Sequence, residues 1–463
     1  MKFNVSPLIR QFSTSPNINP KICVVGSGPA GFYAAQYLGK RLQAAEIDIY
    51  ERLPVPFGLV RFGVAPDHAN LKNCTNTFSK TAQFPNVRFL GNVAVGRDVS
   101  IKQLKEAYHV ILLSYGVDDS RKLPVKGGDL KNVFQAKNFV GWYNGVPWDK
   151  DLPVDLSGST AAIFGHGNVA IDVARLLLSP VDRLKTTDIT EHALAAFSQS
   201  RVKEVCLIGR RGPLQVAFTT KELRELLNMK GCCNVWRPED MEGVPEIVPQ
   251  LVKPRKRLTE LIVDKFQTRR APESGERLLK MIFLRSPKEF SSSNNDVVEE
   301  IKLSINKLEG EDLLNKRAVL TDGEEIIQTN LVVNSIGYKS VQADTDIPFD
   351  FDRGVVKNKY GRIGDGLYTA GWLATGASGV LLHTMENAFG VGGVILKDME
   401  IEGFVSNNKP GFEAVKIILD EKNVQVVTWK DWLKIDQFEK NEGQKLNKPR
   451  EKVVDIEQML KIA

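Results

Sequence analysis

The chain has 463 residues, which is enough for two to four domains that each bury a hydrophobic core. Its composition, 42% hydrophobic and 25% charged, is typical of a globular protein, and no apolar run approaches the roughly 20 residues that a membrane-spanning helix needs. The formal net charge of +6 is too small to indicate a nucleic-acid partner, and we expect none.

The first 20 residues have the composition of a mitochondrial targeting segment. They contain Arg10 and several Ser and Thr, and the first carboxylate of the chain is Glu46. A secretory signal would need a longer apolar core. A polar, frayed terminus is the alternative interpretation.

A glycine-rich turn follows the first predicted strand. The apolar residues 21–25 lead into the sequence Gly26-Ser27-Gly28-Pro29-Ala30-Gly31, which opens a helical pattern. In such a turn, Gly26 and Gly28 allow a pyrophosphate to approach the backbone, and Gly31 lets helix and strand pack closely. The next strand ends in Glu51, 20 residues after Gly31, where a carboxylate accepts hydrogen bonds from an unphosphorylated ribose. The pattern predicts an FAD site.

Strands and helices alternate from residue 21 to residue 116, which indicates a parallel sheet with helices on both faces. The apolar run 109–115 closes at Gly116 and is typical of a buried strand. An irregular Gly- and Pro-rich segment before it carries Asp67 and His68.

A second glycine turn follows residues 160–164 and reads Gly165-His166-Gly167-Asn168-Val169-Ala170. Here the next strand, 204–209, ends in Arg210 and Arg211 instead of an acid. Guanidinium groups bind phosphate oxygens, whereas a carboxylate would repel a ribose 2′-phosphate. The second turn is therefore predicted to bind NADP(H).

The remaining pattern indicates nested domains. A helix is expected within 179–200 and another over 219–229, the polar stretch 286–300 is expected to form an exposed loop, and a second apolar strand closes at Gly337. Gly116 and Gly337 would mark paired crossings between domains. We predict an α/β protein with two nested Rossmann-like dinucleotide-binding domains, of the glutathione-reductase-like, three-layer ββα type. Its parts are a transit-like segment (1–20), an FAD-binding part (21–117), an NADP-binding domain (118–335) and a second FAD-binding part (336–463), which ends in a short amphipathic helix.

The number and spacing of the cysteines indicate which group can accept electrons from the flavin. The five cysteines form no Cys-x-x-Cys pair and no four-cysteine spacing, which suits a reducing compartment and excludes a disulfide reductase or an iron–sulfur protein. We predict no metal site. Because a flavin can release its electrons singly, an external one-electron carrier is the natural acceptor.

Seven segments together resemble the mitochondrial type of NADPH:adrenodoxin (ferredoxin) oxidoreductase, fungal members most of all: ICVVGSGPAGFYAAQYL, VPFGLVRFGVAPDH, FVGWYNG, GHGNVAIDVAR, GRRGPLQVAFTTKELRE, SIGYKS and KPREKVVD. The similarity runs from about residue 21 to the C-terminus. It implies FAD contacts at Ala30, Glu51, Leu59, Val95, Trp372, Gly379, Val380 and Leu381. It implies NADP contacts at His166, Gly167, Asn168, Val169, Arg210, Arg211, Glu222 and Gly379. Animal relatives more often carry Gln in place of His166, and residues 371–380 are less basic than in the family.

The resemblance also implies roles near the flavin and on the surface. His68 is expected to tune the flavin or move a proton, with a structural histidine as the alternative. Asp172 is expected to orient the nicotinamide amide, or else to be an exposed helix carboxylate. Trp372 is expected to cover the flavin, with a plain core position as the alternative. The predicted docking residues for a small acidic two-iron two-sulfur ferredoxin are Arg224, Lys253, Arg255, Lys256 and Arg257.

These observations predict an FAD-dependent oxidoreductase that takes a hydride from NADPH and passes single electrons to an adrenodoxin-like ferredoxin in the mitochondrial matrix. We expect at most a peripheral association with the inner membrane. The family supports iron–sulfur cluster assembly, haem A formation or steroid-type hydroxylation, and a fungal source favours the first two. A nucleotide-bound interaction scaffold without turnover is the alternative.

Overall fold

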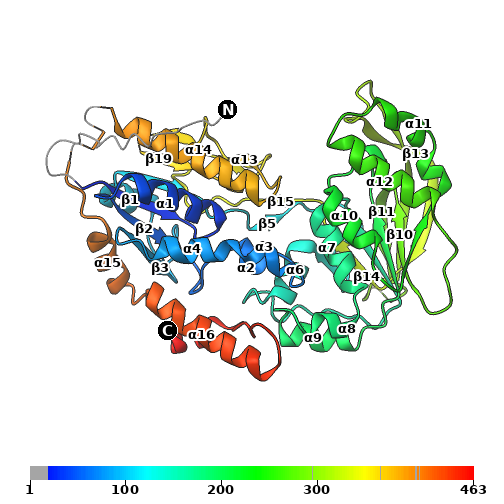
Figure 1. Cartoon of the computed structure of the whole chain (residues 1–463), viewed down its shortest axis with the longest axis horizontal. Helices are drawn as coiled ribbons and strands as arrows, with labels where there is room; N and C mark the ends of the chain where they lie inside the picture. The colour runs from blue at the N-terminus through cyan, green and yellow to red at the C-terminus, as the bar shows by residue number, and fades with distance from the viewer. Residues whose placement is uncertain (1–18, 295, 365, 402–403, 406) are drawn as a thin grey trace, which may run out of the picture.

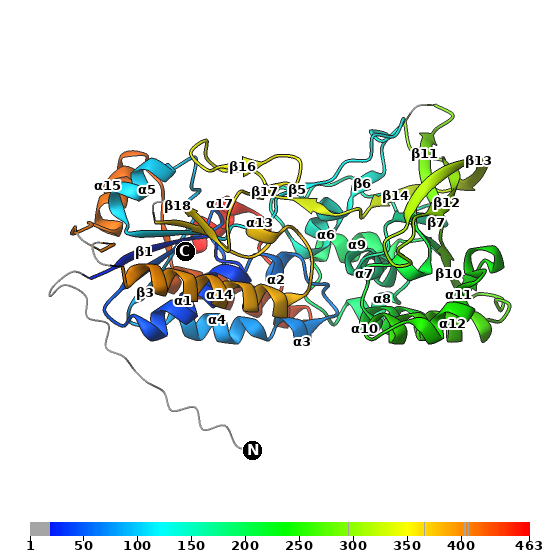
Figure 2. The same ribbon diagram turned by 90° about the horizontal axis from the view of Figure 1, so that it is seen from above.

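The computed structural model describes residues 19–463 except 295, 365, 402, 403 and 406 (Figure 1). The expected targeting segment lies outside these residues, apart from its last two. The described chain forms two lobes side by side, each built around a parallel sheet, and we refer to them as the first and the second unit (Figures 1 and 2). No described helix combines the length and the apolarity that a membrane crossing requires.

The first unit contains a seven-stranded sheet. β1, β2, β3, β4 and β19 are parallel, and β18 and β20 pair antiparallel at the two edges. The strand order is β18 (Arg362–Gly364), β19 (Leu367–Thr369), β4 (Val110–Leu113), β1 (Lys21–Val25), β2 (Glu46–Tyr50), β3 (Val87–Gly91), β20 (Val427–Thr428).

Helices cover both faces of this sheet (Figure 2). One face packs against α1, α4 and α14, and the other against α5 and α15. Successive residues of β1 from Ile22 to Val25 face opposite cores, so this part of the strand is apolar throughout, as expected for a sheet covered on both sides. The helices are α1 (Pro29–Arg41), α2 (Leu59–Phe62), α3 (Ala69–Lys72), α4 (Cys74–Ala82), α5 (Ile101–Ala107), α13 (Trp372–Thr375), α14 (Leu381–Met399), α15 (Phe412–Glu421), α16 (Trp429–Lys445) and α17 (Ile456–Ile462). A small hairpin, β16 (Phe349–Asp350) with β17 (Val355–Val356), completes the unit.

The second unit contains a six-stranded parallel sheet. Its strand order is β6 (Val133–Gln135), β14 (Leu331–Asn334), β7 (Thr160–Phe164), β8 (Glu204–Ile208), β10 (Arg277–Ile282), β9 (Cys232–Trp236). Its helices are α6 (Ala136–Asn144), α7 (Asn168–Leu177), α8 (Val181–Leu184), α9 (Glu191–Ser198), α10 (Thr220–Leu227), α11 (Val244–Ile247) and α12 (Arg255–Gln267), with 3₁₀ turns η1 (Pro213–Gln215), η2 (Pro238–Met241) and η3 (Val248–Gln250).

An antiparallel sheet forms a third layer in the second unit. It contains β11 (Arg285–Ser291), β12 (Glu300–Glu309) and β13 (Arg317–Gln328). Phe290, Ile301 and Leu303 of this sheet pack against Phe164 and Ile208 of the parallel sheet. The order helices, parallel sheet, antiparallel sheet agrees with the predicted α/β class and ββα layering.

One local expectation was wrong. The stretch 286–300 was expected to be an exposed loop, but residues up to Ser291 belong to β11, and Phe290 is buried in the third-layer core. The exposed or half-buried Lys288 and Glu289 make this strand look like a loop in the sequence, whereas Arg285 and Phe290 are buried.

The two chain crossings between the units lie side by side. β5 (Asp119–Ser120) pairs antiparallel with β15 (Tyr338–Lys339), and the Ser340 hydroxyl donates to the carbonyl oxygen of Gly116 at 2.9 Å. Figure 1 shows this pair between the two lobes.

Candidate functional site

The first glycine turn joins β1 to α1 and leaves room for a ligand. Gly26 has φ +102°, and a Cβ there would lie 2.6 Å from the Cα of Tyr115. A Cβ on Gly31 would lie 2.0 Å from the carbonyl oxygen of Gly26, so helix and strand approach as closely as predicted. A Cβ on Gly28, in contrast, would meet nothing within 4 Å. The open side of the turn is therefore at Gly28, where a pyrophosphate can contact the backbone.

Glu51 lies beside this turn at the carboxyl end of β2. Its Oε2 accepts from the backbone nitrogen (3.0 Å) and the hydroxyl (2.7 Å) of Ser27, and its Oε1 accepts from the nitrogen of Leu53 (3.1 Å). These bonds hold the carboxylate within reach of a ribose on the turn, and no arginine or lysine pairs with it among the described residues.

Two residues that are predicted to contact the flavin, Leu59 and Val95, follow residues that lie beside the first glycine turn or Glu51. A Cβ on Gly58 would lie 3.1 Å from the Cα of Gly28, so Leu59, the first residue of α2, begins beside the turn and is 38% exposed. The nitrogen of Val93 donates to the backbone carbonyl oxygen of Glu51 at 2.8 Å, so the segment containing Val95 begins beside the backbone of Glu51.

The remaining flavin contacts come from the other part of the first unit. A Cβ on Gly371 would lie 2.6 Å from the Cβ of Ala30, so the turn before α13 packs directly on α1. The Trp372 indole donates to the carbonyl oxygen of Ser378 at 3.0 Å, and the Trp372 ring stacks on Tyr338. Gly379 has φ +84°, and it leads into α14 through two residues that are predicted to contact the flavin: Val380, 40% exposed, and Leu381. The predicted FAD residues thus converge from β1, β2, α2 and α14, and the open surface at Gly28 fits the group.

The second glycine turn joins β7 to α7 with the same geometry. Gly165 has φ +127°, and a Cβ there would lie 2.1 Å from the carbonyl oxygen of Ser335, whereas Gly167 has open space around it. The imidazole of His166 points into the unit, where its Nε2 lies 3.1 Å from the carbonyl oxygen of Leu207. Burial lowers the pKa of His166 to about 4, so the ring is neutral. Only the backbone of His166 can therefore face a ligand on this turn.

The segment from Gly212 to Thr219 lies against the second turn. The nitrogen of Thr219 donates to Oδ1 of Asn168 at 2.8 Å, and the nitrogen of Ala217 donates to the carbonyl oxygen of His166 at 2.8 Å. Val169 follows in the first turn of α7, packed against the core of the unit.

The arginine pair lies where β8 ends. Arg210 is exposed and Arg211 is half-buried, and neither forms an ion pair with a carboxylate in the described part of the chain. Burial and the neighbouring charge of Arg210 lower the pKa of Arg211. An anion such as a 2′-phosphate would relieve the repulsion between the two cations.

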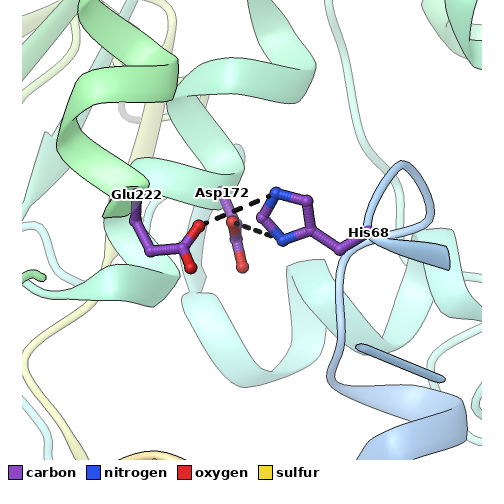
Figure 3. A group of neighbouring side chains, drawn as sticks. All are labelled: His68, Asp172 and Glu222. Atoms are coloured by element: carbon purple, nitrogen blue, oxygen red, sulfur yellow. Dashed lines mark ion pairs between the residues drawn. The ribbon is translucent and has the colours of Figure 1, made fainter. Parts of the chain in front are cut away.

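A histidine of the first unit meets carboxylates of the second (Figure 3). The Nδ1 of His68 lies 3.8 Å from Oδ1 of Asp172 on α7, and its Nε2 lies 3.7 Å from Oε2 of Glu222 and 2.9 Å from Oε2 of Glu225, both on α10. Burial raises the pKa of Asp172, although the charge of Arg175 opposes this effect. The buried Oε2 of Glu222 has no hydrogen-bond donor among the described residues. The predicted residues His68, Asp172 and Glu222 are thus brought together.

A buried arginine holds this meeting point together. Arg175 on α7 donates two hydrogen bonds of 2.8 Å to Asp67, the neighbour of His68, and one of 2.7 Å to Asp172. Burial would raise the pKa of Asp67, but Arg175 outweighs burial and lowers it. Because Asp67 belongs to the first unit and Arg175 to the second, this ion pair fixes the position of His68 between the units.

The three side chains also offer one ligand atom each within 4.8 Å of one another, a spacing that a small cation can bridge. His68 is already bonded to Glu225, however, and Asp172 to Arg175. Because His68 and Asp172 already have these partners, we interpret the three side chains as part of the contact between the units and not as a metal site.

Sequence reasoning missed two members of this cluster, Glu225 and Arg175. Each lies three residues after a predicted residue on the same helix, Glu222 on α10 and Asp172 on α7, and so shares its face. The helical spacing was the available signal.

The predicted docking residues lie on two neighbouring helices, α10 and α12, except Lys253, which lies two residues before α12. α10 packs against α12, and Arg224, Lys253 and Arg257 are exposed. Lys256 is half-buried, and Arg255 turns inward to the carbonyl oxygen of Val216 at 2.9 Å. Beside Arg224 lies a hollow of about 600 Å³ that is lined by further cations: Arg183, Lys221 and Lys230. The structure therefore groups four of the five predicted residues at the surface and separates Arg255 from them.

Comparisons with known proteins agree with this geometry. A profile of the NAD(P)-binding Rossmann-like domain family matches residues 24–90, from the first glycine turn to β3. The chain is 47% identical to mitochondrial NADPH:adrenodoxin oxidoreductase of Salvelinus fontinalis, over 97% of this chain and 92% of that protein. It is also 47% identical to the Homo sapiens protein of that name, over 97% and 93%.

Similarity extends to a fungus and to solved structures. The probable mitochondrial NADPH:adrenodoxin oxidoreductase of Schizosaccharomyces pombe is 36% identical over 99% of this chain and 98% of its own. The structure of Mycobacterium tuberculosis FprA in complex with NADPH superposes with a TM-score of 0.90 at 36% identity, over 96% of this chain and 99% of that chain.

Proposed function

The chain belongs to the mitochondrial NADPH:adrenodoxin oxidoreductase family, and from this premise we propose how its residues share the work of the reaction. The protein is an NADPH-dependent flavoprotein reductase that passes electrons to a ferredoxin. The observation that carries the assignment is the contrast between the two glycine turns, one beside Glu51 and the other beside Arg210 and Arg211.

FAD supplies the chemistry that no side chain can, because it accepts a hydride as an electron pair and releases electrons singly. We assign its pyrophosphate to the open side of the first turn at Gly28 and its adenosine ribose to Glu51. The start of α14, at Gly379, Val380 and Leu381, would face the polar edge of the flavin. The close packing of Gly371 on Ala30 supports this arrangement, since it brings α13 and α14 to the first turn.

NADPH is assigned to the second turn. Gly167 leaves the backbone open to the pyrophosphate, while Arg210 and Arg211 would pair with the 2′-phosphate. The nicotinamide would then extend toward Glu222 and the junction between the units. Gly379, whose φ of +84° suits glycine, would bring the backbone at the start of α14 to the nicotinamide and flavin rings.

His68, Asp172 and Glu222 would orient the nicotinamide and manage a proton at the junction. Because burial favours the neutral form of Asp172, its carboxyl group can hold a proton at a higher pH than an exposed aspartate. The His68 ring, facing Asp172 through Nδ1 and Glu225 through Nε2, could pass a proton between them. The clamp between Asp67 and Arg175 supports this role, since it holds the ring in place.

Electrons leave to an external carrier. The five cysteines are all free, so no disulfide is available to take the electrons from the flavin. We propose that a small acidic two-iron two-sulfur ferredoxin docks on the cations of α10 and α12: Arg224, Lys253, Lys256 and Arg257. Opposite charge across such a surface mainly raises the rate of encounter.

The cellular assignment follows from the family. Relatives are named mitochondrial, and the acid-free N-terminus has the composition of a targeting segment. We propose a place in the matrix, with at most a peripheral contact to the inner membrane, and a role in iron–sulfur cluster assembly and haem A formation. Sheet membership supports a division at residues 117/118 and 335/336, with the flavin-binding domain interrupted by the NADP-binding one.

Absorbance spectroscopy tests the assignment against a scaffold without turnover. The purified protein should carry a visible flavin band, and NADPH should bleach that band in the absence of oxygen while NADH does so far less well. A colourless protein, or a flavin band that NADPH leaves unchanged, would defeat the enzyme assignment.

A further inference from the structure

Arg255 is separated from the other cations of its segment. It is the first residue of α12, and its Nη1 donates to the carbonyl oxygen of Val216 at 2.9 Å. Lys253 and Arg257, two residues to either side, are exposed to solvent. The Arg255 guanidinium is thus bonded to a neighbouring segment of its own unit, and this contact calls for an explanation other than docking.

The acceptor of this hydrogen bond belongs to the segment that carries the arginine pair. Val216 follows Arg211 by five residues, and the intervening turn η1 packs against α12. The same segment contacts the second glycine turn through Ala217 and Thr219. Arg255 therefore lies on the wall of the nucleotide site, at the end where β8 finishes.

Three arginines gather at this end without a counter-charge. The charge of Arg211 acts on Arg255, and that of Arg210 acts on Arg211, and in both cases it adds to burial in lowering the pKa. None of the three forms an ion pair with a carboxylate in the described part of the chain, and the first turn of α12 carries no acidic residue. Neighbouring cations of like charge repel one another unless an anion lies between them, so this cluster of one exposed and two half-buried arginines is suited to receive an anion.

We propose that Arg255 is a third specificity residue for NADP(H), which closes the 2′-phosphate pocket from the side of α12 opposite Arg210 and Arg211. A dianionic phosphate offers oxygens enough for three guanidinium groups. Arg255 would also hold the segment 212–219 over the turn through Val216, so that the pocket is formed before the nucleotide arrives. The inference rests on the proposed assignment of NADP(H) to the second turn, and it removes Arg255 from the ferredoxin surface.

Calorimetric titration of the FAD-containing protein with 2′,5′-ADP and with 5′-AMP tests the proposal directly. The two probes differ only in the 2′-phosphate. In Arg255→Gln, the affinity for 2′,5′-ADP should fall about tenfold or more, while that for 5′-AMP should change less than about twofold. The KM for ferredoxin should not change. Lys265→Gln is the matched control, because it removes one positive charge from the same helix about 15 Å farther along its axis, and it should bind both probes like the wild type.

The outcomes separate the inference from its premise. A wild-type protein that does not prefer 2′,5′-ADP to 5′-AMP would overturn the NADP assignment itself. Three results would overturn the role of Arg255 alone. One is an Arg255→Gln variant that keeps the full preference for 2′,5′-ADP, and another is a variant that loses affinity for both probes equally. The third is a raised KM for ferredoxin while the nucleotide affinity stays unchanged. If Arg255→Gln does not keep its flavin, Arg255→Lys decides: weaker 2′,5′-ADP with unchanged 5′-AMP supports the proposal, and unchanged binding of both contradicts it.

Discussion

Glu51 and the pair Arg210-Arg211 occupy equivalent places in the two units, at the carboxyl end of the strand that follows each glycine-turn helix. Their charges are opposite, and so are their surroundings. Glu51 accepts hydrogen bonds from Ser27 and Leu53, whereas the arginines have no carboxylate partner in the part of the chain that the structure describes. On our proposal, a choice of one or two side chains distinguishes a ribose from a ribose phosphate on otherwise similar backbones.

Replacing both arginines should separate the two nicotinamide nucleotides. Each hydrogen bond to a charged group contributes about 1.5–3 kcal/mol, so Arg210→Ala with Arg211→Ala should weaken NADPH by at least about 100-fold. NADH, which lacks the 2′-phosphate, should bind nearly as before. Steady-state KM values for the two nucleotides provide the measurement, and equal weakening of both would count against the assignment.

The places of the candidate residues in the fold were predictable where spacing along the chain encodes them. The glycines, Glu51 and the arginine pair follow from distance to a turn. The bond between His68 and Glu225 does not, because the two residues are 157 positions apart and meet only when the units pack. The hydrogen bond of Arg255 could not be predicted for a similar reason, since its acceptor, the carbonyl oxygen of Val216, lies on a different element.

At the scale of elements, each glycine turn contains one glycine that serves packing and one that serves the ligand. Gly31 has no room for a side chain, because a Cβ there would lie 2.0 Å from the carbonyl oxygen of Gly26. A Cβ on Gly28 would point into open space. The alternation of strand and helix that frames these turns is encoded locally, by apolar runs and helical periodicity, and was predictable. The strand at 285–291 was not, because its polar sequence gains its structure from pairing with β12.

The two glycines should therefore respond differently to alanine. Gly28→Ala should leave the stability of the flavin-free protein within about 0.5 kcal/mol but weaken FAD binding about tenfold or more, because the methyl group occupies the space of the pyrophosphate. Gly31→Ala should lose stability as well, since helix and strand must separate. Flavin content after dialysis and urea unfolding of the flavin-free proteins distinguish the variants. Full FAD affinity in Gly28→Ala would contradict the site.

At the scale of the whole molecule, a segment near the C-terminus crosses from the first unit to the second. We call residues 447–455 the C-terminal strap; they follow α16, which runs along the lower side of Figure 1 toward α9. Lys448 donates to the carbonyl oxygen of Ile189, and Lys452 pairs with Asp188 at 3.2 Å. Lys72 of the first unit pairs with the same Asp188 at 2.7 Å. Two lysines thus share one carboxylate between the units.

Burial of Lys452 gives the strap a pH dependence. Burial lowers the pKa of Lys452 to about 7; Asp188 opposes this effect, and Lys72 and Arg61 add to it. An unfolded lysine keeps its proton up to about pH 10. Between these values the unfolded chain binds more protons than the folded one, so the free energy of unfolding rises with pH by up to about 1.4 kcal/mol per unit.

The variant Lys452→Met should lose this slope. Asp188 retains Lys72 as a partner, so no charge is left alone. Urea unfolding of both proteins from about pH 7.5 to about pH 9.5 should show the wild type gaining stability relative to the variant. Parallel pH profiles would show that Lys452 stays charged in the folded protein.

The central claim is that NADPH on the second unit gives a hydride to the flavin held by the first unit, and that this flavin passes single electrons to a docked ferredoxin. Its most direct measurement is anaerobic mixing of the flavin-containing protein with NADPH and an acidic two-iron two-sulfur ferredoxin, with both visible spectra followed over time. The account predicts that the flavin band bleaches and recovers, that two ferredoxin molecules are reduced for each NADPH consumed, and that rising ionic strength slows the transfer. A ferredoxin that stays oxidised while NADPH is present would contradict it.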